Sequence, residues 1–268
     1  MITRTVSRLF NLAGRLGRFY PVGPNGVGCI ENGKGKALTQ TTLQAKPHTY
    51  STSRVPLSYT KAQSLAEFNA WSENYDSSPL QGLLFTPSHN CLMDHIAMNS
   101  NSFELLDIGC GTGVFAERII KRFPGSKVSG VDLSPQMISR ALRRSEHIPD
   151  LQFLQADCES LPFSDGNFDI ITCSNSFHHY PNQAKAVAEM YRVLKPDGKL
   201  MIIDGYRDRT WGGFIYDVCV VAVEGAVHHA SAGEFHELFH SAGFDDIQQQ
   251  AKLSLAPFLL TMGTKAKN

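Results

Sequence analysis

Residues 103–113 read Phe-Glu-Leu-Leu-Asp-Ile-Gly-Cys-Gly-Thr-Gly, and this stretch decides the fold. An apolar run, Phe103 to Leu106, enters a glycine-rich turn, and a helical pattern begins directly after it at Val114. Glycine lets the backbone turn sharply and brings bare main-chain amides close to a ligand. The stretch therefore predicts a strand, a tight turn and a helix that together hold a nucleotide-like ligand.

The spacing of the glycines limits the kind of ligand. Gly109, Gly111 and Gly113 are two residues apart, without the three-residue final step of the dinucleotide fingerprint, and no Lys-Ser/Thr pair follows as in a phosphate-binding loop. A nicotinamide-dependent dehydrogenase is therefore the less favoured interpretation.

Strand-like and helical runs alternate along the rest of the chain. The predicted strands are 103–108, 127–132, 151–156, 168–174, 199–204, 245–252 and 255–262, and the predicted helices are 114–122, 135–145, 182–194, 212–228 and 232–242. Strict alternation predicts a parallel sheet with helices on both faces, and the last two strands are expected to be antiparallel at the sheet edge. The sequence thus predicts a Rossmann-like, seven-stranded, mostly parallel α/β fold that binds ligands beyond the carboxyl ends of its strands.

Acidic residues end the second and third of these strands. Asp132, nineteen residues after Gly113, can accept hydrogen bonds from both hydroxyls of a ribose, although it could also cap the next helix. Asp157 can accept a hydrogen bond from an adenine amino group, with an apolar neighbour closing the pocket. Met137 is either a polarizable surface for adenine or ordinary core packing.

On these residues the chain resembles the class I S-adenosylmethionine-dependent methyltransferases, specifically their ubiquinone/menaquinone-methylase-like, small-molecule subgroup. The resemblance covers about residues 68–244. The motifs that carry it are 107–113, 130–134, 157–163, 168–169, 176–179 and 192–198. Asp197 stands where the family usually has glycine, a turn position that Asp tolerates.

The resemblance implies S-adenosylmethionine as cofactor and assigns its contacts. Gly109, Gly111 and Gly113 would cradle the methionine part, Asp132 would bind the ribose, and Asp157 with the Cys158 backbone would read adenine. A Tyr-Asp pair that folds over the cofactor in many relatives corresponds to Tyr75-Asp76. The full expected set is Tyr75, Asp107, Gly109, Cys110, Gly111, Gly113, Asp132, Leu133, Met137, Asp157, Cys158 and Asn175.

Methyl transfer from a sulfonium requires alignment of the nucleophile and exclusion of water, and no covalent intermediate. A phenol, enol or carbon acid also benefits from a base. His178 and His179 follow the fourth strand and are the candidates for that base, because imidazole titrates near neutral pH. The alternative is that they shape the pocket through hydrogen bonds.

The acceptor is expected to be small and partly apolar, a quinone-, polyketide- or lipid-like molecule, because aromatic and apolar residues fill 211–223. The chain has neither an Asn/Asp-Pro-Pro-Tyr/Phe motif nor a Pro-Cys nucleophile. Residues 67–268 hold sixteen Lys and Arg against twenty-four acids, so a nucleic-acid partner is not expected. A catalytically silent, cofactor-binding assembly or regulatory partner is the alternative function; the oligomeric state is left open.

Two further patterns, a formal zinc-hydrolase motif and the spacing of the cysteines, bear on metal binding. His236-Glu237-Leu238-Phe239-His240 formally matches a zinc-hydrolase signature, with His228-His229 as a further source of ligands, but it also fits the helix that precedes the edge strands. The six cysteines have no Cys-x-x-Cys pair, so no zinc or disulfide framework is expected and no metal is assigned.

The first residues differ from the rest. Residues 1–66 hold nine Lys and Arg against one acid, Glu31, and the apolar positions of 2–16 recur at helical spacing. This basic amphipathic pattern predicts a mitochondrial transit peptide, with a disordered tail on a cytoplasmic protein as the alternative. Residues 1–61 are interpreted as a mostly disordered extension and 62–268 as the methyltransferase domain. No apolar run is long enough to span a membrane.

Overall fold

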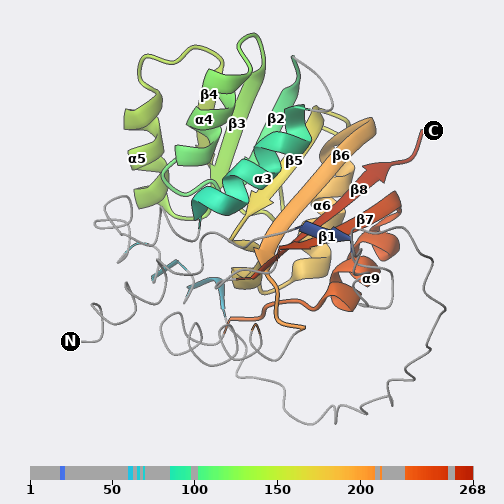
Figure 1. Ribbon diagram of the computed structural model, residues 1–268. Helices are drawn as coiled ribbons and strands as arrows, with labels where there is room; N and C mark the ends of the chain where they lie inside the picture. Colours follow the sequence, from blue (N-terminus) through green and yellow to red (C-terminus); the bar gives the residue numbers. More distant parts are fainter. Residues whose placement is uncertain are drawn as a thin grey trace, which may run out of the picture.

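The computed structural model describes residues 19–21, 60–62, 65, 66, 69, 85–97, 102–208, 212, 227–252 and 257–267. Its centre is one eight-stranded sheet in the order β1-β7-β8-β6-β5-β2-β3-β4 (Figure 1). The predicted seven-stranded, mostly parallel core is confirmed. The eighth strand, β1 (Phe19–Pro21), was not predicted and pairs antiparallel with β7 at the edge.

Five neighbouring strands of this sheet run parallel. They are β6 (Leu194–Gly205), β5 (Phe168–Ser174), β2 (Glu104–Ile108), β3 (Lys127–Asp132) and β4 (Leu151–Gln155). Their buried, β-branched and aromatic residues face helices on both sides, as expected of a parallel sheet. All five carboxyl ends therefore lie at the same edge, where the acidic residues predicted to bind the cofactor are found.

The last two strands, β7 (Phe244–Lys252) and β8 (Phe258–Lys265), are antiparallel to each other, as predicted. β8 also pairs antiparallel with β6, so it lies inside the sheet, and β7 lies beyond it. Their order places the chain's last strand between two earlier ones, which local sequence patterns do not reveal.

Helices cover both faces of the sheet and enclose two apolar cores. α3 (Thr86–Ala97), α4 (Val114–Arg122) and α5 (Pro135–Ser145) pack on one face, and α6 (Gln183–Val193) and α9 (Ala232–Ala242) on the other (Figure 1). Local chemistry sets the helix ends. Ser134 caps α5 by accepting from the Met137 amide, and Ser231 and Glu234 form a capping box at α9.

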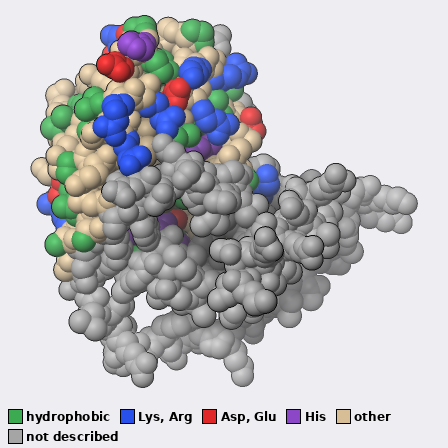
Figure 2. Space-filling model, turned by 90° about the vertical axis from the view of Figure 1, so that its left-hand side faces the viewer, with side chains coloured by type: hydrophobic (Ala, Val, Ile, Leu, Met, Phe, Trp, Pro, Cys, Tyr) green, Lys and Arg blue, Asp and Glu red, His purple; other side chains and the backbone are tan. Residues whose placement is uncertain are grey.

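The surface over α4 and α5 is basic. Figure 2 shows Lys and Arg side chains gathered on this face, and Lys121, Arg122 and Arg143 are exposed there. The net negative charge of the domain is thus unevenly distributed over its surface. The prediction that it does not bind nucleic acid stays a prediction.

Two of the sequence-based expectations fall largely outside the described residues: the transit peptide within 1–61 and the helix 212–228. Within the described part of the chain, no helix has the length and apolar character needed to cross a membrane.

Candidate functional site

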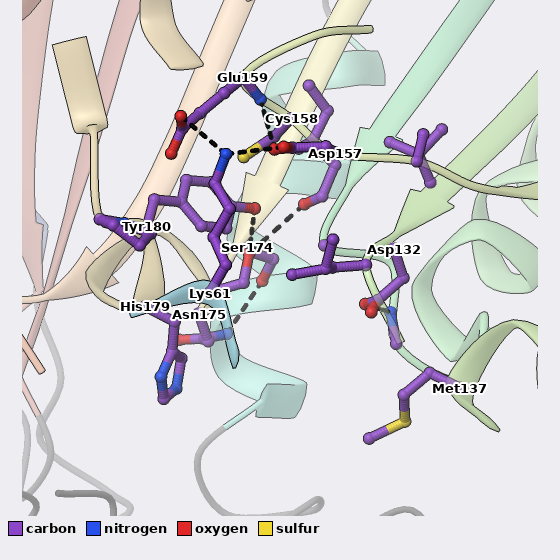
Figure 3. A pocket seen from close by; sticks show the side chains of 18 residues that line it. Lys61, Asp132, Met137, Asp157, Cys158, Glu159, Ser174, Asn175, His179 and Tyr180 are labelled. Carbon is purple, nitrogen blue, oxygen red and sulfur yellow. Dashed lines mark hydrogen bonds and ion pairs between the residues drawn. The ribbon is translucent and has the colours of Figure 1, made fainter. Parts of the chain in front are cut away.

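A cavity opens at the carboxyl ends of β2, β3 and β5, on the edge where the sequence places a ligand. Its empty space is about 740 Å³ with the open mouth included. Figure 3 shows Asp132 and Asp157 arriving from neighbouring strand ends. Of the predicted cofactor residues, those that line it are Gly109, Gly111, Asp132, Leu133, Met137, Asp157, Cys158 and Asn175.

The backbone of the glycine-rich turn adopts a conformation that only glycine adopts readily. Gly109 and Gly111 have φ values of 69° and 55°, a left-handed conformation that side chains disfavour. A Cβ on Gly109 would also collide with the Ser176 side chain. The amides of Gly109 and Cys110 donate to the carbonyl of Val131 at 2.9 and 3.0 Å, which ties the turn to β3.

Asp132 joins this turn to the start of α5. Its Oδ2 accepts from the Gly111 amide at 2.9 Å, and its Oδ1 accepts from the Ser134 amide at 2.8 Å. Burial raises the pKa of Asp132, and the backbone hydrogen bonds oppose that rise. Because a carboxylate offers about four acceptor positions, two remain for the hydroxyls of a ribose. Cap-like bonding and ligand binding are thus compatible roles.

Asp107 and Cys110 belong to a smaller cavity on the other side of the turn, which Gly109 and Gly111 also line. Asp107 is buried and accepts a hydrogen bond from Thr172 Oγ1 at 2.8 Å. Burial, with some repulsion from Asp132, raises the pKa of Asp107 to about 7. Gly113 lies away from both cavities and packs against Phe153, so its role is structural.

The third strand end carries an ion pair that the sequence did not predict. Lys61 Nζ lies 2.7 Å from Asp157 Oδ2 and 2.8 Å from Glu159 Oε2, and Lys61 lines the cavity (Figure 3). Burial acts to raise the pKa of Asp157, but Lys61 outweighs it and lowers that pKa below its usual range. Glu159 is buried, and its Oε1 has no hydrogen-bond partner among the described residues. This end of the cavity is therefore strongly polar.

The two predicted base candidates have different surroundings. They lie on the short helix η2 (Phe177–His179), after β5. His179 lines the cavity, and burial followed by the neighbouring His178 lowers its pKa well below the usual range. His178 lies behind it, with its ring centroid 4.2 Å from that of His179. Its Nδ1 is 2.7 Å from Oδ1 of Asp204.

Asp204 is the functional candidate that sequence reasoning missed. It is the second-last residue of β6, so it lies near the carboxyl end of its strand, as Asp132 does at the end of β3 and Asp157 just beyond β4. The rule that acids at strand ends face the ligand could have singled it out. Lys61 had no comparable signal, because its partners lie 96 and 98 residues further along the chain.

Two other predictions concerned Tyr75 and the residues 236–240. Tyr75 lies outside the described residues. His236 and His240 lie on α9 with ring centroids 6.4 Å apart. Within the described part of the chain, the residues close enough to share a metal ion are instead His178, Asp204 and His229. A zinc hydrolase built on residues 236–240 is not supported.

The cavity fits an adenosyl ligand. A left-handed turn with no side chains at Gly109 and Gly111, a carboxylate at the second strand end, apolar surfaces from Leu133 and Met137, and a second carboxylate at the third strand end surround one space. A Cβ at Gly109 would close the turn against η2. The residues therefore suit the methionine, ribose and adenine parts of S-adenosylmethionine.

Comparison with known proteins agrees with this geometry. Residues 106–202 match the family model described as "Methyltransferase domain". A demethylmenaquinone methyltransferase of Thermus thermophilus is 37% identical over 110 residues, which is 41% of this chain and 50% of that protein. The chain thus spans about half the length of the curated relatives it matches.

Solved structures share the fold. The crystal structure of YcgJ from Bacillus subtilis has a TM-score of 0.59 and 22% identity, covering 68% of this chain and 100% of that one. A Haemonchus contortus phosphoethanolamine N-methyltransferase, determined with S-adenosylhomocysteine, has a TM-score of 0.56 and 19% identity, covering 68% and 53%.

Proposed function

We propose that this chain, which carries a class I S-adenosylmethionine-dependent methyltransferase domain, transfers the methyl group of that cofactor to a small, partly apolar acceptor. One observation carries the proposal. Gly111 in the glycine-rich turn, Asp132 at the end of β3 and Asp157 beyond β4 line a single cavity, and Gly111 is hydrogen-bonded to Asp132. Each supplies the group that one part of the cofactor requires.

On the cofactor side, the residues bind and orient. Asp132 would accept the ribose hydroxyls, Asp157 the adenine amino group, and Met137 and Leu133 would cover the faces of the base. When bound, S-adenosylmethionine supplies a methyl group on a positively charged sulfur. The left-handed turn at 109–111 is held in shape by its hydrogen bonds to Val131 and Asp132 before binding, so little reorganisation is needed.

On the acceptor side, the chain supplies alignment and a base. The cavity continues from the turn to Ser174, Asn175 and His179 at the carboxyl end of β5. The strongly lowered pKa of His179 keeps its imidazole neutral at pH 7 and makes it a weak base, so we assign it to the wall of the acceptor pocket. We assign the base to His178, which lies directly behind His179 and is hydrogen-bonded to Asp204.

A quinone-like acceptor is the most specific form of this proposal. It is supported by the similarity to a demethylmenaquinone methyltransferase over 110 residues. It is also supported by the apolar, aromatic composition of residues 211–223, which follow β6. Polyketide-like and lipid-derived molecules share the same shape and polarity and form the comparison set.

A methyl-transfer assay with purified protein tests the proposal. We expect labelled cofactor to yield labelled small molecules from an apolar metabolite extract, and a hydroquinone bearing an isoprenoid tail to compete. A chain that binds S-adenosylmethionine but transfers no label would favour the silent, cofactor-binding partner. A chain that does not bind the cofactor would contradict both functions.

A further inference from the structure

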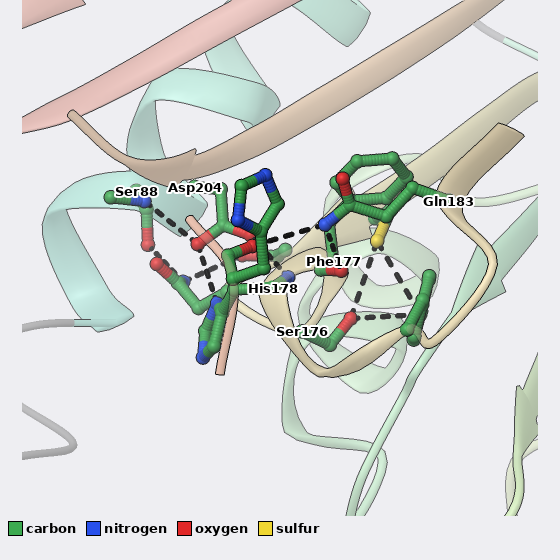
Figure 4. A network of polar contacts seen from close by, with 12 residues as sticks. Ser88, Ser176, Phe177, His178, Gln183 and Asp204 are labelled. Carbon is green, nitrogen blue, oxygen red and sulfur yellow. Dashed lines mark hydrogen bonds and ion pairs between the residues drawn. The ribbon is translucent and has the colours of Figure 1, made fainter. Parts of the chain in front are cut away.

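Two imidazoles, His178 and His229, and one carboxylate, Asp204, meet behind His179, which lines the cavity. Figure 4 shows His178 beside Asp204. His178 comes from η2, Asp204 from the end of β6, and His229 from the segment that precedes α9. They are 7%, 2% and 3% exposed, so water is largely excluded from all three. A buried charge is stable only where hydrogen bonds or opposite charges offset the free energy lost on leaving water.

Asp204 is held tightly by hydrogen bonds. Its Oδ2 accepts from the His178 amide at 2.9 Å, and its Oδ1 accepts from the Gly205 amide and from His178 Nδ1, both at 2.7 Å. Burial alone would raise the pKa of Asp204, but His178, His229 and these hydrogen bonds lower it to about 2. Asp204 is therefore ionised at neutral pH, and it requires a proton on His178 Nδ1.

Among the described residues, the other groups around His178 do not supply a second strong base. His229 stacks on it with ring centroids 4.3 Å apart, and burial followed by the field of His178 lowers the pKa of His229 to about 3. His179 is likewise held neutral. Arg207 donates to the His229 carbonyl at 3.0 Å, and the His228 amide donates to the His178 carbonyl at 3.1 Å.

The ring geometry favours proton transfer over metal binding. The planes of His178 and His229 are only 16° from parallel. An imidazole binds a metal through a lone pair in its ring plane, and one ion cannot lie in the planes of two stacked rings. Metal binding would thus require one ring to turn.

We propose that His178 acts as a general base and that Asp204 is its positioning residue. The acceptor is accordingly one that must lose a proton: a phenolic or enolic hydroxyl, or an acidic carbon. This proposal rests on the proposed methyltransferase function. A neutral amine needs no such base. A carboxylate that accepts a hydrogen bond from Nδ1 holds the imidazole as the tautomer whose Nε2 can take up a proton.

The step balances as follows for a hydroxyl acceptor. The hydroxyl proton moves to His178 Nε2, and the oxygen's electron pair forms a bond to the methyl carbon. The bond between that carbon and sulfur breaks, and its electrons stay on sulfur. The products are a methyl ether, S-adenosylhomocysteine and a protonated imidazole, which Asp204 stabilises and which then returns its proton to solvent.

The first test reads the imidazole directly. The full chain, labelled with ¹⁵N-histidine, should show His178 as the tautomer protonated at Nδ1, and Asp204→Asn should lose that tautomer. Asp245→Asn, an exposed acid on β7, is the matched control and should change nothing. A His178 protonated at Nε2 in the unaltered chain, or stoichiometric divalent metal in the purified protein, would overturn the proposal.

The second test uses turnover. Asp204→Asn should lower kcat by about 100-fold or more, leave the KM for S-adenosylmethionine nearly unchanged, and move the acid limb of the pH–rate profile to lower pH. Asp204→Glu should recover part of the rate. A loss of rate with the acid limb unmoved would mean a structural role and would contradict the proposal.

The acceptor class is read from the product. With ¹³C-methyl S-adenosylmethionine and an apolar metabolite extract, the carbon shift of the transferred group distinguishes O-, C- and N-methyl products. We expect O- or C-methyl products, and an N-methyl product as the main one would contradict the acceptor class. If no product forms at all, the proposed function fails, while the tautomer measurement still decides the His178–Asp204 pairing.

Discussion

Oδ2 of Asp132 accepts a hydrogen bond from the Gly111 amide at 2.9 Å, so the carboxylate expected to bind ribose also holds the glycine-rich turn in place. The other oxygen accepts from the Ser134 amide at the start of α5. A single side chain thus links the turn after β2, the end of β3 and the first turn of α5. Cofactor affinity and the shape of the site depend on the same residue.

Asp132→Ala is expected to weaken S-adenosylhomocysteine binding by roughly 100-fold, because two charge-assisted hydrogen bonds to the ribose are lost. It should also lower the free energy of unfolding by about 1–3 kcal/mol, because the amides of Gly111 and Ser134 lose their acceptor. Calorimetric titration and urea unfolding measure the two effects. Asp245→Asn serves as the control, and equal affinity in both variants would place the ribose elsewhere.

Lys61→Met is expected to make cofactor binding more sensitive to acid. Lys61 holds the pKa of Asp157 below its usual range, so without Lys61 that pKa rises and Asp157 takes up its proton at a higher pH. A protonated Asp157 accepts less well from the adenine amino group. Titrations with S-adenosylhomocysteine from about pH 3 to about pH 6, a window that spans the usual Asp pKa of about 3.9, should show the acid midpoint moving upward. A midpoint that does not move would separate Asp157 from adenine binding.

Gly113→Ala is expected to destabilise the domain more than Gly125→Ala does. Both glycines have positive φ, 80° and 91°, so each substitution carries a conformational cost of about 1 kcal/mol. A Cβ on Gly113 would also come within 2.5 Å of Phe153, whereas nothing lies within 4 Å at Gly125. The difference between the two urea unfolding free energies isolates the packing term, expected at about 1–3 kcal/mol. Equal losses would show that Phe153 moves aside freely.

Asp107→Asn is expected to change how stability depends on pH. The folded-state pKa of Asp107, about 7, lies above its unfolded value, so its protonated form favours folding below the unfolded pKa, and that contribution is lost as pH rises toward 7. This loss approaches about 1.4 kcal/mol per pH unit within that window. Unfolding free energies at pH 5, 6 and 7 should therefore fall less steeply in Asp107→Asn. Parallel slopes would mean that Asp107 is ionised in the folded chain.

Most helices and strands could be predicted from the sequence, because short stretches of residues determine where each begins and ends. The bounds of α4, β3, α5, β5 and α9 agree with the predicted ranges, since caps, glycines and apolar periodicity mark both ends of each. Asp197 has a φ of 62°, which bears out the expectation that it occupies a glycine-like turn. The strand order around β8 and the pairing of β1 with β7 depend on contacts between distant segments, for which the sequence carries no local mark.

The residues of the candidate site also fall into those that local sequence patterns predict and those that they do not. Residues on the glycine-rich turn and at the first strand ends were predictable, because a parallel sheet brings its carboxyl ends together. Gly113 was predicted to bind the cofactor. In the structure it packs against Phe153, which leaves no room for a Cβ. Lys61 and the pairing of His178 with Asp204 arise from side chains 26 or more residues apart, and only the folded chain shows them.

Transfer of labelled methyl groups from S-adenosylmethionine into apolar small molecules, compared between the unaltered chain and Asp132→Ala, tests the central claim most directly. The account predicts labelled product with the unaltered chain and with the Asp245→Asn control, and its loss with Asp132→Ala. Transfer that persists undiminished in Asp132→Ala, or no transfer by an unaltered chain that is folded, would contradict it.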